Sequence, residues 1–197
     1  TPRGAALLCV PLYHIAGITS MLTSVFTGRR LVILRQFEAA EWLETVQREQ
    51  ITHAFVVPTM LKRVLDHPAF RQDSCSSLEI LAYGAAPMPL PVIRRAIAMF
   101  PSTVGFVNAF GQTETTATVT MLLPDDHRLE GSALEMEKKL QRLASIGRPL
   151  SDVEVRIVDP EGAELEVGGA GAEAPAGLEQ RTDELGVHVE PRAGERD

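Results

Sequence analysis

A chain of 197 residues with 45% hydrophobic and 23% charged residues has the size and composition of a soluble globular protein of one domain or one and a half. No apolar run reaches the ~18 residues of a membrane-spanning helix. The net charge of −7 is unevenly spread, because eleven acidic residues and only three arginines fall within 159–197. The remainder is about neutral and has no basic patch interleaved with aromatic residues, which disfavours nucleic-acid binding.

The two cysteines, Cys9 and Cys75, are too few for a disulfide framework and lack metal-ligand spacing. They therefore predict a reducing, cytoplasmic setting. The N-terminus has neither an initiator Met nor a signal-peptide pattern. A processed chain and a fragment both fit that beginning.

Apolar runs alternate with helix-like segments over the first 110 residues. Gly28 follows one helix-like segment as a C-cap, and Pro58 opens another at its first turn. This alternation predicts an α/β fold of right-handed βαβ units with a mainly parallel sheet, whose ligands bind beyond the carboxyl ends of the strands. The predicted strands are 5–10, 30–35, 52–57, 78–83 and 104–110, and the predicted helices are 15–26, 38–49, one from residue 58, and 89–99. The helix 15–26 is mostly apolar, which is typical of a helix in the core.

The C-terminal third changes character twice. Residues 131–144 predict a polar helix with Glu135 and Lys139 paired at i, i+4, and 145–149 predict a turn. Residues 152–158 alternate as a half-buried strand does. The segment 168–197 is rich in Gly, Ala, Pro, Glu and Arg and has few bulky apolar side chains, and we expect it to be disordered or non-native. A frameshift in GC-rich coding sequence and a deliberate acidic linker both explain such a composition.

The most informative segment follows the predicted strand 104–110. Gly111, Gln112, Thr113 and Glu114 place a flexible backbone, an amide, a hydroxyl and a carboxylate together. Thr113 can bind a phosphate oxygen, and Glu114 is a hard oxygen ligand of the kind that Mg²⁺ prefers. A Thr-rich helix N-cap that binds nothing is the alternative interpretation.

Two further segments follow predicted strands. Tyr83-Gly84-Ala85-Ala86-Pro87 leaves a slot beside small residues that a flat ring can enter, although most such segments are plain turns. The segment 11–17, P-L-Y-H-I-A-G, places His14 at the mouth of a strand, where it can hydrogen-bond near neutral pH or serve a structural role.

Together these segments resemble the adenylate-forming enzymes, in particular the AMP-forming acyl-CoA synthetases, over residues 5 to about 167. The run Phe110–Glu114 is similar to their (Y/F)GxTE signature, 83–87 to their GGAP-type segment, and 11–17 to their P-x-x-H-x-x-G element. The segment 145–149 is similar to an SxGxP segment that leads into a small β-barrel subdomain.

This resemblance implies roles for individual residues. Thr113 and Glu114 would act on the phosphates, with Glu114 as the Mg²⁺ ligand, and His14 would position the acyl carboxylate. The nucleotide-binding residues would be Gly84, Ala85, Ala86 and Pro87 on one side of the adenine, Asn108 and Phe110 on the other with the Asn amide near the exocyclic amine, and Gly111, Gln112 and Thr113. The substrates would be a small-molecule carboxylic acid, ATP and coenzyme A.

Several parts of such an enzyme have no counterpart in these residues. The Ser/Thr/Gly-rich phosphate loop, the TGD-like segment for the ribose, and the C-terminal domain with its catalytic lysine are missing. The three lysines, Lys62, Lys138 and Lys139, match no motif. We therefore expect 1–148 to be a partial AMP-binding domain, 149–167 the start of a β-barrel subdomain, and 168–197 a disordered or frameshift-like tail.

The sequence thus predicts a fragment of an ATP-dependent acyl-CoA synthetase, acting on a fatty or other hydrophobic acid and inactive without its N- and C-terminal parts. One alternative keeps the adenylation and loads a carrier protein instead of CoA. The other is a nucleotide-binding or interaction module without turnover, which agrees with the missing lysine and phosphate loop.

Overall fold

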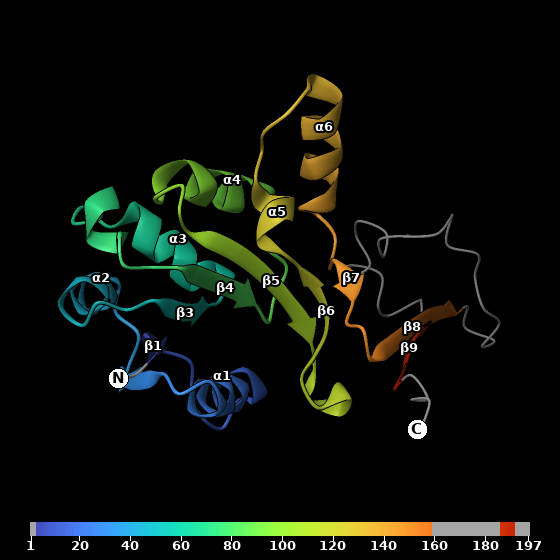
Figure 1. The fold of residues 1–197 in the computed structure, drawn as a ribbon, viewed down its shortest axis with the longest axis horizontal. Coiled ribbons are helices and arrows are strands. Elements are labelled where there is room, and N and C mark those ends of the chain that lie inside the picture. Colours follow the sequence, from blue (N-terminus) through green and yellow to red (C-terminus); the bar gives the residue numbers. More distant parts are fainter. Residues whose placement is uncertain (1–2, 159–185, 192–197) are drawn as a thin grey trace. The chain divides into compact units, whose positions relative to one another are not determined.

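The structure is a computed structural model that describes residues 3–158 and 186–191 (Figure 1). Its larger sheet has seven strands in the order β2-β1-β3-β4-β5-β6-β7. The chain divides into two compact units, residues 1–107 and 108–197, each taken here by itself, and strand β5 begins in the first and ends in the second. We expected a boundary after residue 148 on motif grounds, and that placement stays a prediction.

The sheet of the first unit is built from short, buried apolar strands. Strand β1 pairs in parallel with β2 on one side and β3 on the other, and β3 pairs in parallel with β4. The predicted α/β fold with a mainly parallel sheet is therefore confirmed. The strands are β1 (Ala5–Leu8), β2 (Arg30–Ile33), β3 (His53–Val56), β4 (Ile80–Gly84) and β5 (Gly105–Gly111).

Helices connect these strands as the sequence predicts. Because β1 lies between β2 and β3, right-handed crossovers place α1 on one face of the sheet and α2, α3 and α4 on the other (Figure 1). Trp42 and Val46, at i, i+4 on α2, are both fully buried. The helices are α1 (Ile15–Phe26), α2 (Ala39–Arg48), α3 (Pro58–Asp66) and α4 (Leu90–Met99), with a short 3₁₀ turn η1 (Gln72–Cys75).

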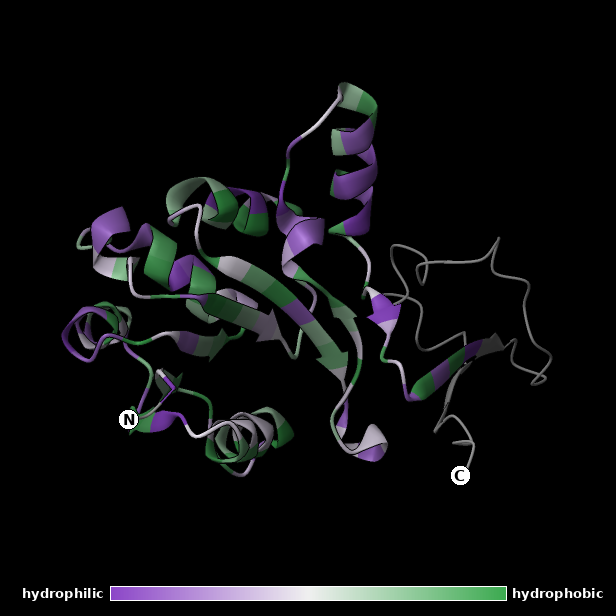
Figure 2. Ribbon diagram, in the orientation of Figure 1, coloured by the Kyte–Doolittle hydropathy of each residue, from purple (hydrophilic) through white to green (hydrophobic). Residues whose placement is uncertain are grey.

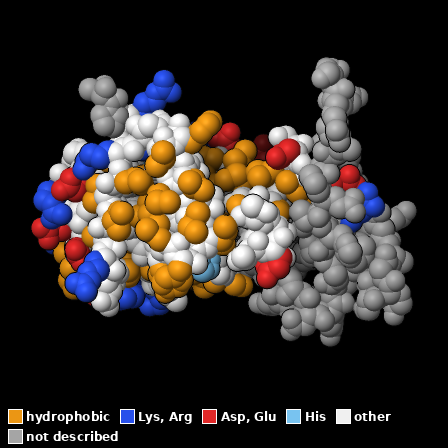
Figure 3. All heavy atoms as spheres, turned by 90° about the horizontal axis from the view of Figure 1, so that it is seen from below, with side chains coloured by type: hydrophobic (Ala, Val, Ile, Leu, Met, Phe, Trp, Pro, Cys, Tyr) orange, Lys and Arg blue, Asp and Glu red, His pale blue; other side chains and the backbone are white. Residues whose placement is uncertain are grey.

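Helix α1 is not the core helix that its composition suggests. Its buried residues are Gly17 and Ser24, whereas Leu22, Val25 and Phe26 are 57%, 64% and 93% exposed. The hydroxyls of Ser20 and Ser24 bond back to carbonyls four residues earlier, so small polar residues face the sheet. Figure 2 shows α1 without strongly hydrophilic residues, and Figure 3 shows apolar side chains gathered on one face.

The second unit has antiparallel pairing. Strand β6 (Thr118–Leu122) runs antiparallel to β5, and β7 (Arg148–Pro149) antiparallel to β6. We did not predict β6, although Thr118 and Thr120 alternate with Val119 and Met121 as in a half-buried strand, and β7 falls inside the predicted turn 145–149. The remaining elements are the 3₁₀ turn η2 (Thr113–Thr115), α5 (Pro124–His127) and α6 (Ala133–Arg142).

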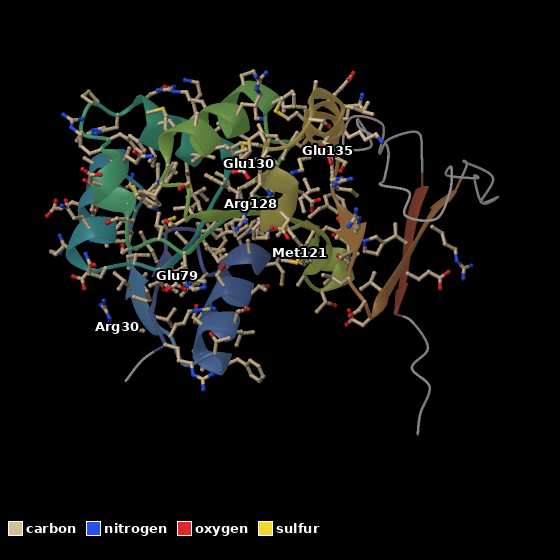
Figure 4. All side chains as sticks on the ribbon, turned by 45° about the horizontal axis from the view of Figure 1, so that its top comes forward. Arg30, Glu79, Met121, Arg128, Glu130 and Glu135 are labelled. Carbon is tan, nitrogen blue, oxygen red and sulfur yellow. The ribbon has the colours of Figure 1, made fainter. Side chains whose placement is uncertain are left out.

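The polar helix α6 forms as predicted but without the expected side-chain pair. Glu135 closes a capping box with Ser132, accepting from its backbone N–H at 2.8 Å and from its hydroxyl at 2.7 Å. Those bonds, that from the hydroxyl first, lower the pKa of Glu135. Lys139 instead donates to the carbonyls of Arg128 and Glu130, two residues labelled in Figure 4, which ties the helix to the preceding loop.

A separate two-stranded sheet pairs β8 (Val153–Val158) antiparallel with β9 (Gly186–Pro191). Residues 186–191, which lie inside the expected tail, thus pair as a strand, while the expectation of a disordered or non-native tail as a whole stays a prediction. The reason is local, since Val187 and Val189 alternate with polar residues over a stretch long enough to pair. Residues 159–185 and 192–197, which hold the rest of the expected tail, lie outside the described residues.

None of the helices in the described ranges is long and apolar enough to cross a membrane.

Candidate functional site

The loop after β5 closes on itself at Gly111. The pairing of β5 with β6 shifts by a bulge between Phe110 and Gly111, and Gly111 lies opposite Thr118. A Cβ at position 111 would collide with the carbonyl of Ala117. Only glycine lets the two ends of the loop come this close, which gives the glycine of the motif a structural reason.

Thr115 fastens the same loop. Its hydroxyl accepts from the backbone N–H of Gln112 at 3.2 Å and lies 3.0 Å from the carbonyl of Gln112 and 3.2 Å from that of Ala117. Thr116 then adopts φ +71°, a left-handed conformation that is rare for a β-branched residue. Sequence reasoning did not single out Thr115, although a hydroxyl three residues after the start of a turn is a known capping signal.

Thr113 and Glu114 lie on the outside of this loop. Both side chains are exposed, and within the described residues neither makes a hydrogen bond or ion pair. Gly111 and Thr115 hold the backbone of the loop together, so the side chains of Thr113 and Glu114 are not needed for its closure and are available to a ligand. The cap of the alternative interpretation is present, because the Thr115 hydroxyl bonds the backbone of Gln112. Ligand binding by Thr113 and Glu114 therefore stays a prediction.

A single exposed carboxylate fits Mg²⁺ bound together with phosphates. That ion uses one or two protein carboxylates and takes its remaining oxygens from water and phosphate. No cluster of three or more His, Cys, Asp or Glu residues that could hold a metal occurs in the described part of the chain.

Asn108 is held inside the second unit. It is 9% exposed, and its Nδ2 lies 3.5 Å from the carbonyl oxygen of Ser145. Phe110, two residues further along β5, is half-buried, and Gln112 is exposed. The structure thus places Asn108 against the turn 145–147, a contact between segments 37 residues apart that no spacing rule predicts.

The loop after β4 has an unusual backbone. Ala85 adopts φ +64°, a conformation that costs a non-glycine residue about 1 kcal/mol or more. Gly84 is buried, whereas Ala85, Ala86 and Pro87 are exposed. Backbone strain of this kind concentrates at binding sites, and the slot beside these residues stays a prediction.

His14 is the N-cap of α1. Its Nδ1 accepts from the backbone N–H of Ala16 at 3.2 Å, and its side chain is exposed. Since Nδ1 is an acceptor there, the ring proton of the neutral form lies on Nε2, which is left as an outward donor. Gly17, whose Cβ would collide with the carbonyl of Pro11, allows the tight turn that holds this histidine.

Within the first unit, His14 and the loop after β4 share one edge of the sheet. Strands β1, β3 and β4 are parallel, so the segments that leave β1 and β4 emerge at the same side. In the second unit, Asn108, Phe110 and the loop to Glu114 are consecutive on β5 and η2.

Comparison with known proteins agrees with these segments. A family model described as AMP-binding enzyme matches residues 1–173. A medium/long-chain-fatty-acid–CoA ligase, FadD8 of Mycobacterium tuberculosis, is 33% identical over 84% of this chain and 26% of its own length. A 2-succinylbenzoate–CoA ligase of Bacillus licheniformis is 31% identical over 82% of this chain and 30% of its own.

Solved structures give the same result. The amide bond synthetase McbA of Marinactinospora thermotolerans superimposes with a TM-score of 0.70 at 28% identity, covering 93% of this chain and 36% of the other. The N-terminal domain of FACL13 of Mycobacterium tuberculosis has a TM-score of 0.69 at 25% identity, over 85% of this chain and 38% of the other. The chain thus spans about a quarter to a third of the curated relatives described above.

Proposed function

Because the chain belongs to the AMP-binding enzyme family, we propose that it supplies the nucleotide-binding part of an AMP-forming acid–CoA ligase. In that reaction a carboxylate oxygen attacks the α-phosphorus of ATP, the bond to the β-phosphate oxygen breaks, and pyrophosphate leaves. The thiol of coenzyme A then attacks the acyl carbon, forming the thioester and releasing AMP.

The observation that carries this proposal is the loop 111–117. Gly111 and Thr115 hold its backbone, so Thr113 and Glu114 are presented without internal partners among the described residues. Thr113 donates its hydroxyl to a phosphate oxygen, and Glu114 orients the cation that accompanies the nucleotide. When bound, Mg²⁺ offsets the charge of the phosphates and of the developing leaving group. Fixing the backbone that carries both side chains reduces what must be ordered on binding.

The base is held by small residues and an amide. The exposed Ala85, Ala86 and Pro87 offer a flat apolar surface, and Asn108 and Phe110 supply an amide and a ring. The family resemblance assigns each of these segments, taken by itself, a role toward the adenine. The strained backbone at Ala85 supports this role, because it is kept at a cost in stability.

His14 positions the acyl carboxylate through its outward Nε2–H. A neutral imidazole that donates one hydrogen bond orients a carboxylate without taking its proton. The acid itself is a fatty or other hydrophobic acid in this proposal. The support is the similarity to FadD8 together with the uncharged helix α1 beside His14, which exposes Leu22 and Phe26.

Taken alone, the 197-residue chain is proposed not to adenylate an acid. Its sequence has no match to the phosphate loop, the TGD-like segment or the catalytic lysine of the family. Nucleotide binding without turnover is therefore the expected behaviour of this chain. The cytoplasmic setting remains a prediction from the cysteines alone.

The test compares binding with turnover. We would titrate the chain with a non-hydrolysable acyl-sulfamoyl adenosine, with AMP and with GMP, and measure acid-dependent pyrophosphate–ATP exchange in parallel. The proposal predicts binding of both adenine compounds, weaker binding of GMP and no exchange. Absence of adenine-nucleotide binding would contradict the nucleotide-binding role, and exchange that disappears in Glu114→Ala would contradict the expected inactivity.

A further inference from the structure

The orientation of the Asn108 amide is set by the group that it faces. A carbonyl oxygen only accepts hydrogen bonds, so the side of Asn108 that faces the Ser145 carbonyl must be its NH₂. The acceptor, Oδ1, is then the amide atom directed away from the Ser145 carbonyl. With its NH₂ group toward the Ser145 carbonyl, the Asn108 amide offers a ligand the acceptor Oδ1 and not a donor.

The turn that carries the Ser145 carbonyl is fixed from β6. The hydroxyl of Thr120, which is 1% exposed, donates to the carbonyl of Ile146 at 2.6 Å. Within the turn, the Ser145 hydroxyl accepts from the N–H of Gly147 at 3.2 Å and donates to the carbonyl of Arg142 at 2.8 Å. Buried hydrogen bonds are costly to break, so this turn has one arrangement.

Gly147 lets the turn approach the strand. Its φ is +87°, and a Cβ there would collide with the carbonyl of Met121, a residue labelled in Figure 4. Thr120 and Met121 are neighbours on β6, so the strand fixes the turn at two successive positions. This accounts for the glycine of the S-x-G-x-P segment, for which the sequence suggested structure more than chemistry.

The same strand pair places Thr120 on the face of Asn108 and Phe110. Phe110 is opposite Thr120 in the antiparallel register, and Asn108 is opposite Leu122. Residues directly opposite each other, and residues two apart on one strand, project from the same face. Thr120 therefore lies beside the two residues that we assign to the base, on the same face and within one unit of the chain.

We propose that Thr120 is a positioning residue: through the Ile146 and Ser145 carbonyls it keeps the Asn108 amide with Oδ1 toward the base, and thereby makes the site select a 6-amino purine. This inference rests on the proposed function and deepens it. Adenine donates from its 6-amino group to Oδ1. A 6-oxo purine would set its own acceptor against Oδ1, leaving two lone pairs face to face and unsatisfied.

The experiment measures the ratio of the affinities for ATP and ITP, which differ in the group at position 6 of the purine and in the proton that ITP carries on N1. Thr120→Val removes the hydroxyl at almost constant shape, and Thr120→Ser keeps it. Thr45→Val is the matched control, because Thr45 is also fully buried and its hydroxyl has no hydrogen-bond partner within the described residues. Each substitution is also made in an Asn108→Ala background.

The wild-type chain is expected to prefer ATP, and Thr120→Val to reduce the ATP:ITP ratio about threefold to tenfold. Thr120→Ser and Thr45→Val keep the ratio. In Asn108→Ala, Thr120→Val has no further effect on the ratio, because the amide through which Thr120 acts is gone. The inference would be overturned if Thr120→Val left the ATP:ITP ratio unchanged, or if it reduced that ratio as much in the Asn108→Ala background as in the wild type. Either result would leave nucleotide binding itself standing.

A second readout needs no nucleotide. The side-chain NH₂ of Asn108 should give a resolved, slowly exchanging pair of amide signals in an NMR spectrum, assigned by their loss in Asn108→Ala. Thr120→Val should increase that exchange at least severalfold, whereas Thr45→Val should not. Equal exchange in wild type and Thr120→Val would contradict the positioning role, even if the chain bound no nucleotide at all.

Discussion

Replacing Gly111 by Ala should open the loop that presents Thr113 and Glu114. The new methyl group would collide with the Ala117 carbonyl and with the Cα of Thr118. These are backbone atoms and cannot rotate aside as a flexible side chain can. The chain must therefore widen the bulge at Phe110 and Gly111, and the hydrogen bonds of Thr115 across the loop are lost with it.

The size of the effect follows from two contributions. Forcing packed backbone apart costs about 1–3 kcal/mol. The two hydrogen bonds of the Thr115 hydroxyl add about 0.5 kcal/mol each, the low end of the usual range because the loop is exposed to water. The free energy of unfolding should thus fall by roughly 2–4 kcal/mol, and the melting temperature by about 4–16 °C for a chain of this size.

Thermal melting followed by circular dichroism measures this change, and Gly28→Ala is its control. Gly28 has φ +71° but open space where a Cβ would lie, so Ala there meets only backbone strain of about 1–2 kcal/mol. Gly111→Ala should be the more destabilising of the two. A melting temperature within 2 °C of the wild type, or a larger loss in Gly28→Ala, would refute the packing argument.

Three further predictions concern other parts of the molecule. Burial raises the pKa of Cys9 from 9.0 to about 12, so above pH 9 the thiol ionises only in the unfolded chain. Ionisation of this thiol in the unfolded chain should then lower the free energy of unfolding by up to about 1.4 kcal/mol per pH unit. The free energy of unfolding, measured by urea titration at several pH values between 8 and 10.5, should fall less steeply with pH in Cys9→Ala than in the wild type. Burial lowers the pKa of His127, so the stabilisation of the fold by its neutral imidazole is present above pH 6.5 and is lost as the pH falls. The free energy of unfolding should therefore decline less between pH 6.5 and 5 in His127→Gln than in the wild type, and an equal decline would contradict this. Phe26→Glu, at a 93% exposed position, should reduce binding of a hydrophobic dye and self-association without lowering the melting temperature; equal dye binding would mean that α1 is not the exposed apolar surface.

The sequence predicts the first unit well because its signals are local. Glycine and proline mark the ends of its helices, and short apolar runs between them become buried parallel strands. The pairing of Trp42 and Val46 on one face of α2 follows from helical periodicity alone. Helix α1 is the exception, since periodicity cannot tell that Ser20 and Ser24 satisfy their hydroxyls on the helix itself and turn toward the sheet.

The site is predicted only in part, for a related reason. Thr113, Glu114 and His14 are recognisable because motifs place chemical groups after strands. Thr115 and Thr120 escape notice because their roles depend on backbone groups that the fold brings near, such as the Ile146 carbonyl 26 residues from Thr120. Strand β9 was missed because the Gly-, Ala- and Glu-rich composition around it indicated disorder, although Val187 and Val189 alternate with polar residues.

The central claim is that Glu114 holds the cation of a bound nucleotide. Calorimetric titration with ATP, in the presence of Mg²⁺ or of a chelator, tests it in the wild type, in Glu114→Gln and in Glu137→Gln, which alters an exposed carboxylate on α6. We predict that Mg²⁺ strengthens binding to the wild type and to Glu137→Gln about tenfold, a difference of about 1.4 kcal/mol, and has little effect in Glu114→Gln. Equal strengthening by Mg²⁺ in Glu114→Gln and the wild type would contradict the assignment of the loop.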